Sequence, residues 1–175
     1  MATETIQYTV LHKEHSIEIR QYNDILLAST KIDPNNYNDS GFNRVFQYIS
    51  GQNESNTKIS MTSPVVSYQE GATLVTGFYV PSQYDKKTVP KPKGEVYIDT
   101  IERAVYVVIT FYGAWTKENY EQHHHVLMDY ISSYNYQIRS DPYTMRYNAP
   151  YIPDHQKRNE IAYQISNYTR GVSIV

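Results

Sequence analysis

Cysteine is absent from the 175 residues of this chain, and so is any long apolar run. Without cysteine there is no disulfide, thiolate metal site or cysteine nucleophile. The apolar stretches fall well short of the roughly 20 residues that a membrane-spanning helix needs, so we predict no membrane span. The first residues also lack the charged start and apolar run of a secretion signal. We therefore expect a soluble, cytoplasmic protein.

An excess of basic charge is also missing, because 16 Lys and Arg face 18 Asp and Glu, a net charge of −2. Proteins that bind the phosphate backbone of nucleic acids carry a basic surplus or stripe, so we expect no nucleic-acid partner. The sequence has no Ser-His-Asp order, no phosphate-binding loop and no His-Glu-x-x-His motif. These absences favour a binding protein over an enzyme, and we expect it to be a monomer.

Tyrosine, in contrast, is abundant, with 19 tyrosines beside four phenylalanines and one tryptophan. Its ring is flat and apolar and its hydroxyl is polar, which suits both β-strands and ligand pockets. The tyrosine content therefore favours a sheet-rich protein.

Two halves of the chain repeat the same order of elements. In the first half, residues 16–32 form a predicted hairpin, and a helix lies between Asp39 or Ser40 and Gly51. In the second half, residues 96–112 form a predicted hairpin, and a helix follows from about 117 to 133 with Thr116 as its cap. Two closing strands follow each helix.

The repeat predicts the fold class. We expect one domain over residues 1–175, made of two pseudo-symmetric units at about 8–80 and 95–166. Each unit has the order β-β-α-β-β. The result is an α+β fold whose mostly antiparallel sheet curls into a distorted barrel with two flanking helices.

One proline interrupts a strand-like stretch, KISMTSPVVSY at residues 58–68. Because proline cannot donate to a sheet ladder, Pro64 must lie at an edge, a bulge or a bend. We expect Pro150, in TMRYNAPYI, at the equivalent place of the second unit. Two matched bends would open gaps between the sheet and the helices, where a flat ligand could enter.

These same blocks resemble a known family. FNRVFQYISGQNE followed by KISMTSPVVSY is similar to the SOUL family of haem-binding proteins, and so are FYVPSQY, FYGAW, YNAPY and KRNEIAYQI. The resemblance extends from about Tyr8 to Ile165. It implies a non-covalent haem or other tetrapyrrole ligand, held in an apolar groove beside the first helix by a carrier or buffer protein.

The resemblance also implies the site residues. The helix supplies an apolar stripe with i, i+3, i+4, i+7 spacing, the strand supplies a methionine, and the loop at 147–155 lies near the groove. His155 is the candidate iron ligand, and Lys157 and Arg158 are candidates for pairing with propionates. The expected cofactor-binding residues are Phe42, Val45, Phe46, Ile49, Met61, Tyr147, Tyr151, His155, Lys157 and Arg158. Phe46 stands where vertebrate relatives have methionine, and Ala162 where the family has tryptophan.

An alternative is an effector-binding or hydrolytic module for another flat aromatic molecule, since the same repeat fold occurs in bacterial proteins of that kind. Their sites use a buried carboxylate, for which Glu102 and Glu160 are the candidates. The triplet at 123–125 is a poor metal site, because successive helical residues point about 100° apart. We expect His124 to pack on the apolar side of its helix and His125 to pair with Asp129.

Overall fold

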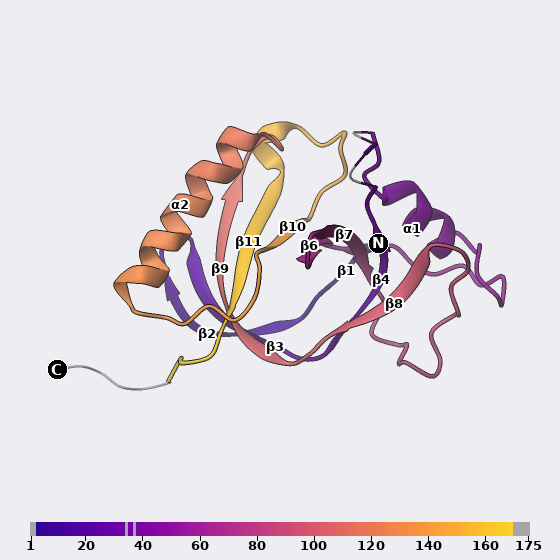
Figure 1. Cartoon of the computed structure of the whole chain (residues 1–175), viewed down its shortest axis with the longest axis horizontal. Helices are drawn as coiled ribbons and strands as arrows, with labels where there is room; N and C mark the ends of the chain where they lie inside the picture. The colour runs from indigo at the N-terminus through magenta and orange to yellow at the C-terminus, as the bar shows by residue number, and fades with distance from the viewer. Residues whose placement is uncertain (1–2, 34, 37, 170–175) are drawn as a thin grey trace.

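A computed structural model describes residues 3–33, 35–36 and 38–169 and shows an α+β fold with a curled sheet and two α-helices (Figure 1). The fold class predicted from the sequence is confirmed. The elements in chain order are β1 (Glu4–Thr5), β2 (Tyr8–Glu14), β3 (Ile17–Tyr22), β4 (Ile25–Lys31), α1 (Phe42–Ile49), β5 (Thr62–Ser63), β6 (Val65–Glu70), β7 (Thr73–Tyr79), β8 (Val96–Ile101), β9 (Ala104–Tyr112), α2 (Lys117–Ser133), β10 (Tyr143–Arg146), the 3₁₀ turn η1 (Asp154–Gln156) and β11 (Arg158–Ile165).

The strand order of the large sheet is β2-β3-β9-β11-β10-β6-β7-β4-β8, and β1 pairs separately with β5. From β3 to β8 this order is symmetric about the β10–β6 pair. If β3 is exchanged with β8, β4 with β9, β6 with β10 and β7 with β11, the result is the same order read from the other end. A duplicated β-β-α-β-β unit would give a strand order of this kind.

The two predicted hairpins at 16–32 and 96–112 are wrong. β3 does not pair with β4; it pairs with β9, while β4 pairs with β8. The ladder keeps one register, from Ile17 opposite Ile109 to Thr30 opposite Val96. The predicted turns are bends in two long strands that cross each other, where the Arg103 N–H donates to Asp24 Oδ1 at 2.7 Å. Turn residues mark a bend, but they do not tell whether the chain folds back on itself.

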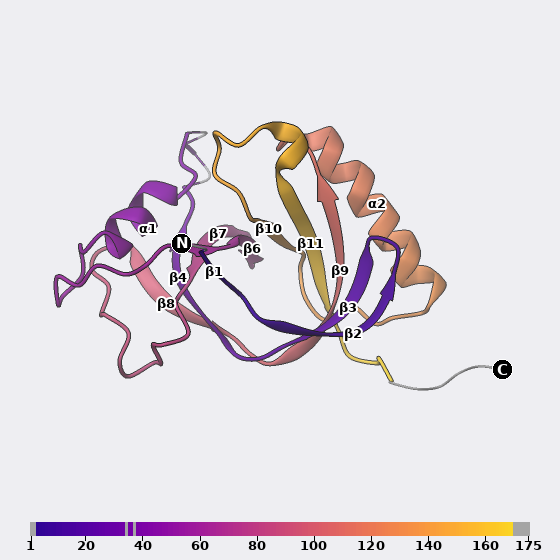
Figure 2. The same cartoon turned by 180° about the vertical axis from the view of Figure 1, so that it is seen from behind.

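The crossing strands make the sheet curl. β3 and β9 lie on one side of the β10–β6 pair, and their continuations β4 and β8 lie on the other. The sheet therefore bends around its interior (Figures 1 and 2). Tyrosines and aliphatic residues share this interior: Tyr22, Tyr68 and Tyr106 pack with Leu27 and Met145, and further tyrosines lie at its edge. The many tyrosines predicted to favour a sheet therefore form much of its inner core.

Both helices lie on the outer face of the sheet, at opposite ends (Figure 1). α2 buries Leu127 and Ile131 against β9 and β11. α1 buries Val45, Tyr48 and Ile49 against β4 and β7. Between the helices, the middle of the sheet has no helical cover, and this uncovered strip forms the floor of the candidate site.

Candidate functional site

A groove of about 620 Å³ lies on the outer face of the sheet, between the start of α1 and the loop that follows β10. Val65 and Phe78 lie on its floor, Phe42 on its α1 side, and Pro150 and Ile152 on its loop side. β6 and β10 are antiparallel, so the start of β6 and the end of β10 meet at the same end of the sheet. The groove thus forms where the two proline-containing segments come together.

The predicted equivalence of Pro64 and Pro150 is wrong in detail. Pro64 breaks the chain between β5 and β6, as expected of a residue that cannot donate to a ladder. Pro150 instead follows β10, so the two prolines lie on opposite sides of their matching strands. They are brought close by strand pairing and not by the internal repeat.

α1 supplies one phenylalanine to the groove lining, Phe42, and a second, Phe46, that stacks on it outside the lining. Phe42 and Phe46 keep 37% and 44% of their surface exposed, and their rings stack with centroids 5.9 Å apart. Phe42 also packs against Phe78 at 5.5 Å. Val45 and Ile49, predicted on the same stripe, lie instead in the core beneath the helix. The rotation of α1 on the sheet therefore leaves an aromatic pair available for a flat ligand.

The start of α1 is fixed by its surroundings. Gly41 has φ of 73°, and a Cβ there would lie only 2.7 Å from the Cγ2 atom of Thr30, so only glycine fits this cap position. Arg44 donates to both carboxylate oxygens of Asp39, at 2.9 and 3.0 Å, and to Thr30 Oγ1 at 2.9 Å. These bonds with Arg44 lower the pKa of Asp39 to about 2. The clamp presents Phe42 at a defined place.

The opposite wall of the groove comes from the segment before α2. Trp115 lines the groove, with the guanidinium of Arg146 5.0 Å and the ammonium of Lys157 4.6 Å from its ring centroid. Lys157 is buried and donates to Asp154 at 2.8 Å. Neither Trp115 nor Arg146 was among the residues predicted from sequence. The FYGAW block was noticed only for its family likeness, and Arg146 at the end of a short strand has no periodic signal.

A second hollow of about 460 Å³ continues beyond Trp115 and Arg146. Its floor carries the hydroxyl residues Ser67, Thr76 and Thr144, which sit side by side on three neighbouring strands. Trp115 and Arg146 line both spaces, as do Ser40, Ser67 and Thr76, so the two spaces adjoin. The surface of both is mostly apolar, and Arg146 places a positive charge where they meet.

Inside the curled sheet, Glu160 is fully buried and surrounded by donors. Arg20 donates to it at 2.6 and 2.8 Å, and Thr110, Tyr147 and Arg158 at 2.6, 2.7 and 2.9 Å. Burial alone would raise the pKa of Glu160, but the bonds and charge of Arg20 lower it below its usual value, helped by Thr110 and by the charge of Arg158. The carboxylate is therefore already neutralised by the protein. The other acidic candidate, Glu102, is exposed in the bend between β8 and β9.

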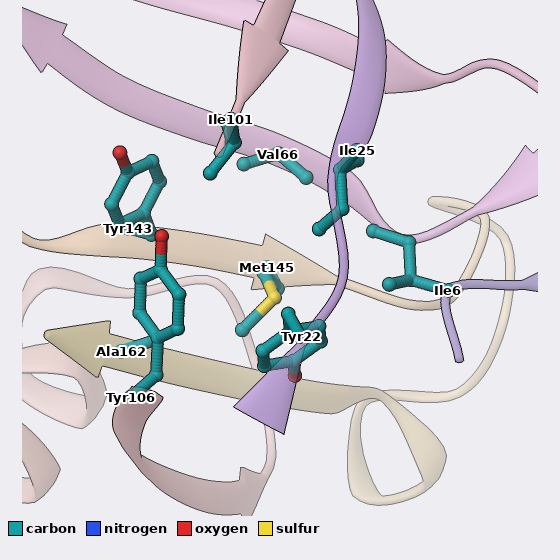
Figure 3. A pocket seen from close by; sticks show the side chains of 9 residues that line it. All are labelled: Ile6, Tyr22, Ile25, Val66, Ile101, Tyr106, Tyr143, Met145 and Ala162. Carbon is teal, nitrogen blue, oxygen red and sulfur yellow. The ribbon is translucent and has the colours of Figure 1, made fainter. Parts of the chain in front are cut away.

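The interior of the sheet leaves room for little else. Figure 3 shows side chains from several strands pointing toward a common space, among them Tyr22, Tyr106, Tyr143 and Met145. The space measures only about 30 Å³ and is lined entirely by apolar surface. Ile6, from the N-terminal segment, closes one side. A volume of this order holds about one water molecule, so the interior is packing and not a ligand site.

The remaining predicted residues come from three places: Met61 before β5, the loop after β10, and the start of β11. Met61, Tyr147 and Tyr151 line the groove, and Tyr151 is 86% exposed. His155 is exposed on η1 and does not line the groove. Arg158 donates to Glu160 and stacks over the Tyr147 ring at 4.1 Å. The structure thus brings together Phe42, Met61, Tyr147 and Tyr151, with Phe46 stacked beside them.

The histidines of α2 pack or face solvent as predicted. His124 contacts the Tyr163 hydroxyl through Nε2 at 2.5 Å, and burial lowers its pKa. His125 lies 3.4 Å from Asp129 on the exposed side. Across residues 3–33, 35–36 and 38–169, no three His, Asp or Glu side chains gather as a metal site, and neither helix is long and apolar enough to cross a membrane.

Comparisons with known proteins agree with the sequence resemblance. A sequence model described as SOUL heme-binding protein matches residues 3–164. Human Heme-binding protein 2 is 35% identical over 106 residues, and its mouse counterpart is 31% identical over 103 residues. Each match covers 53% of this chain and 50% of the relative, so the chain spans about half the length of the curated relatives it matches.

Solved structures share the fold at low sequence identity. The C-terminal domain of EcmrR has a TM-score of 0.66 at 12% identity, covering 93% of this chain and 100% of that domain. A hydrolase from Listeria innocua has a TM-score of 0.53 at 8% identity, covering 94% of both chains. SAV2435 bound to tetraphenylphosphonium has a TM-score of 0.52 at 12% identity, covering 93% and 95%. At these identities the likeness concerns the fold alone.

Proposed function

Because the chain belongs to the SOUL heme-binding protein family, we propose that it binds haem, or a related tetrapyrrole, non-covalently in the groove beside α1. The observation that carries this proposal is the aromatic pair Phe42 and Phe46, held half-exposed next to a groove of about 620 Å³. Small-molecule sites usually enclose about 300–1,000 Å³ and are mostly apolar. A protein that exposes large aromatic side chains beside such a space has a surface that a flat ligand can cover.

The groove residues fit a macrocycle. Phe42 and Phe78 offer ring faces, while Met61 offers an adaptable side chain at the rim. Tyr147 lies at the opposite side, fixed by its bond to Glu160 at 2.7 Å. The apolar ring system of a tetrapyrrole would gain from leaving water for these contacts, at about 25 cal/mol for each Å² of apolar surface buried.

The iron ligand is a separate part of the proposal. Haem iron in proteins is held by nitrogen, sulfur or oxygen donors from His, Met, Cys or Tyr. Two of the groove-lining residues could supply such a donor, Met61 through its sulfur and Tyr151 through its oxygen. His155 lies on η1, beyond the groove lining. His155 stays the nitrogen candidate predicted from sequence.

A carrier or buffer role suits the open position of the groove. The site lies on the outer face of the sheet, between the two helices, and the exposed Tyr151 lies on its loop side. A ligand there can enter and leave without unfolding the interior. As part of the same proposal, the protein works in the cytoplasm as a monomer. Size-exclusion chromatography with and without haem tests the monomeric state.

The alternative, a module that uses a buried carboxylate on a flat aromatic molecule, has less support. The buried carboxylate is Glu160, and Arg20 and Arg158 already neutralise it. The nearby interior measures only about 30 Å³. Such a ligand would instead compete for the groove, so a haem titration in the presence of small aromatic compounds separates the two functions.

Absorption titration with haem tests the proposal. We expect a saturable Soret shift with Kd in the micromolar range or tighter, which corresponds to about −8 kcal/mol or better. Phe46→Asp should weaken binding at least about tenfold, because it places a charge against the stacked ring of Phe42. Val126→Asp replaces an equally exposed residue on α2 and should leave Kd unchanged.

The result that would contradict haem binding is an unsaturable, linear absorbance change, or an equal affinity in Phe46→Asp, Val126→Asp and wild type. Repeating the titration with His155→Ala examines the ligand assignment. Altered ligand-field bands would support His155 as the iron ligand, and an unchanged spectrum would remove it.

A further inference from the structure

Arg146 differs from the other arginines around the site. Arg20, Arg44 and Arg158 each donate to carboxylates of the protein at 3.0 Å or less. For the side chain of Arg146 the described part of the chain shows no hydrogen bond and no ion pair; its guanidinium lies against the Trp115 ring. Arg146 is an exposed residue at the end of β10, so its guanidinium is open to a ligand from outside the protein. An arginine side chain without a protein acceptor can donate two parallel hydrogen bonds to the carboxylate of a ligand.

The surroundings of Arg146 favour an anion. Three hydroxyl residues line the adjoining hollow: Thr144, and Ser67 and Thr76, which the hollow shares with the groove. The N-terminal end of the 17-residue helix α2 borders the same hollow through Thr116 and Lys117, and helix N-termini carry partial positive charge. Three independent features, a cation, a row of hydroxyls and a helix start, thus face one space.

The carboxylate nearest to this hollow does not cancel its positive character. Asp39 lines the hollow, but it is paired with Arg44 through two bonds of 2.9 and 3.0 Å. Lys117 lies 3.8 Å from Glu121 in a highly exposed pair, which is worth little in water. The charge of Arg146 is therefore the one that a ligand in the hollow would meet at close range.

One buried atom in the hollow also lacks a partner. Asn159 is 3% exposed and lines the hollow; its Nδ2 donates to the Gly113 and Lys157 carbonyl oxygens at 3.1 and 3.3 Å, which fixes the amide orientation. Its Oδ1 is buried and accepts no hydrogen bond from the described residues. A buried acceptor without a donor is costly.

We propose that the hollow beyond Arg146 is a carboxylate-binding subsite, so that the whole site selects flat apolar molecules that carry carboxylates on one edge. This inference rests on the proposed function, because the apolar body of the ligand lies in the groove beside Phe42. Arg146 and Trp115 stand at the boundary of the two spaces, so a ligand body in the groove directs its acidic edge to the guanidinium. Arg146 thereby takes the role that the sequence assigned to Lys157 and Arg158, which are already paired with Asp154 and Glu160.

Pairs of ligands that differ only in the acid test this subsite. Haem and haem dimethyl ester have the same macrocycle, but the ester has no carboxylate. Wild type should bind haem at least about tenfold more tightly than the ester. Arg146→Ala should remove this preference by weakening haem binding alone, and Arg146→Lys should restore part of it. Arg139→Ala, which removes an exposed arginine bonded to Ser166 and Gln137, should change neither affinity.

A second pair, pyrenebutyric acid and pyrenebutanol, makes the test independent of tetrapyrroles. If haem and its ester both fail to bind but the pyrene acid binds wild type more tightly than Arg146→Ala, the subsite stands and the haem function falls. If acid and neutral members bind equally to wild type in both pairs, or if Arg146→Ala keeps the preference for the acids, the carboxylate subsite is wrong. Circular dichroism of each variant establishes that it is folded.

Discussion

At the scale of single residues, Glu160 joins the inner core to the groove. It accepts from Arg20 inside the sheet and from Tyr147, whose ring lines the groove. Its sequence context, NEIAYQI, could suggest a catalytic carboxylate as easily as a structural one. Only the three-dimensional positions of Arg20 and Arg158, one of them 140 residues away, show that the charge is already paired.

This network predicts a pH-dependent contribution to stability. Glu160→Gln should lower the free energy of unfolding at pH 7 by up to about 3–5 kcal/mol, since it removes the fully buried one of the two carboxylates paired with Arg20 and leaves only Glu18. The pKa of Glu160 is lowered in the folded state, so the unfolded chain binds the proton more readily. The stabilisation is therefore present above the ordinary glutamate pKa of 4.5 and is lost as pH falls below it.

Urea unfolding at pH 7 and at steps below pH 4.5 measures this effect. The gap between wild type and Glu160→Gln should narrow as the pH falls, because wild-type Glu160 becomes protonated. The exposed residue Glu102 gives the matched control, and Glu102→Gln should change stability little at any pH. If the difference in unfolding free energy between wild type and Glu160→Gln stays constant down to acid pH, the charge of Glu160 does not stabilise the protein.

At the scale of elements, α1 has two sides with different tasks. Val45 is fully buried against the sheet, while Phe46 is half-exposed beside the groove. The i, i+3, i+4, i+7 spacing correctly indicated a helix with one apolar stripe. It could not show which part of the stripe meets the sheet, because that depends on how the Gly41 cap and the Arg44–Asp39 clamp orient the helix.

The two sides should respond differently to truncation. Val45→Ala should lower the free energy of unfolding by about 1–3 kcal/mol through lost burial, and should change haem affinity little as long as the protein stays folded. Phe46→Ala should cost less than about 1 kcal/mol of stability but weaken haem binding. Chemical unfolding together with Soret titration measures both. Equal effects of the two substitutions on affinity would mean that the exposed aromatic side of α1 has no special part in binding.

The elements also show where sequence reasoning reaches its limit. Thr116 caps α2 as predicted, with its side chain accepting from the Asn119 N–H at 3.2 Å. Caps and periodic stripes are local, so one sequence is enough to find them. The crossing of β3–β4 with β8–β9 is not local, and the strand β2 before it was not predicted. Trp115 and Arg146 were not predicted as site residues for the same reason. They lie about 30 residues apart in the sequence, and only the fold brings them together beside one groove.

At the scale of the whole molecule, the curled sheet separates two spaces. The interior is packed with tyrosines and one neutralised charge network, whereas the outer face is left open between α1 and α2. Composition and repeat order predicted the fold class, because a duplicated unit with tyrosine-rich strands favours such a sheet. They did not predict which face would hold the ligand. We propose that the ligand occupies the outer face of the sheet.

Chemical-shift mapping with zinc protoporphyrin, which is diamagnetic, tests that claim most directly. In ¹⁵N–¹H spectra we expect the perturbed amides to cluster at the start of α1, around Met61 and along residues 147–152, with few changes elsewhere. Perturbations centred instead on Ile6, Tyr22 and Tyr106 would place the ligand inside the sheet and contradict the account.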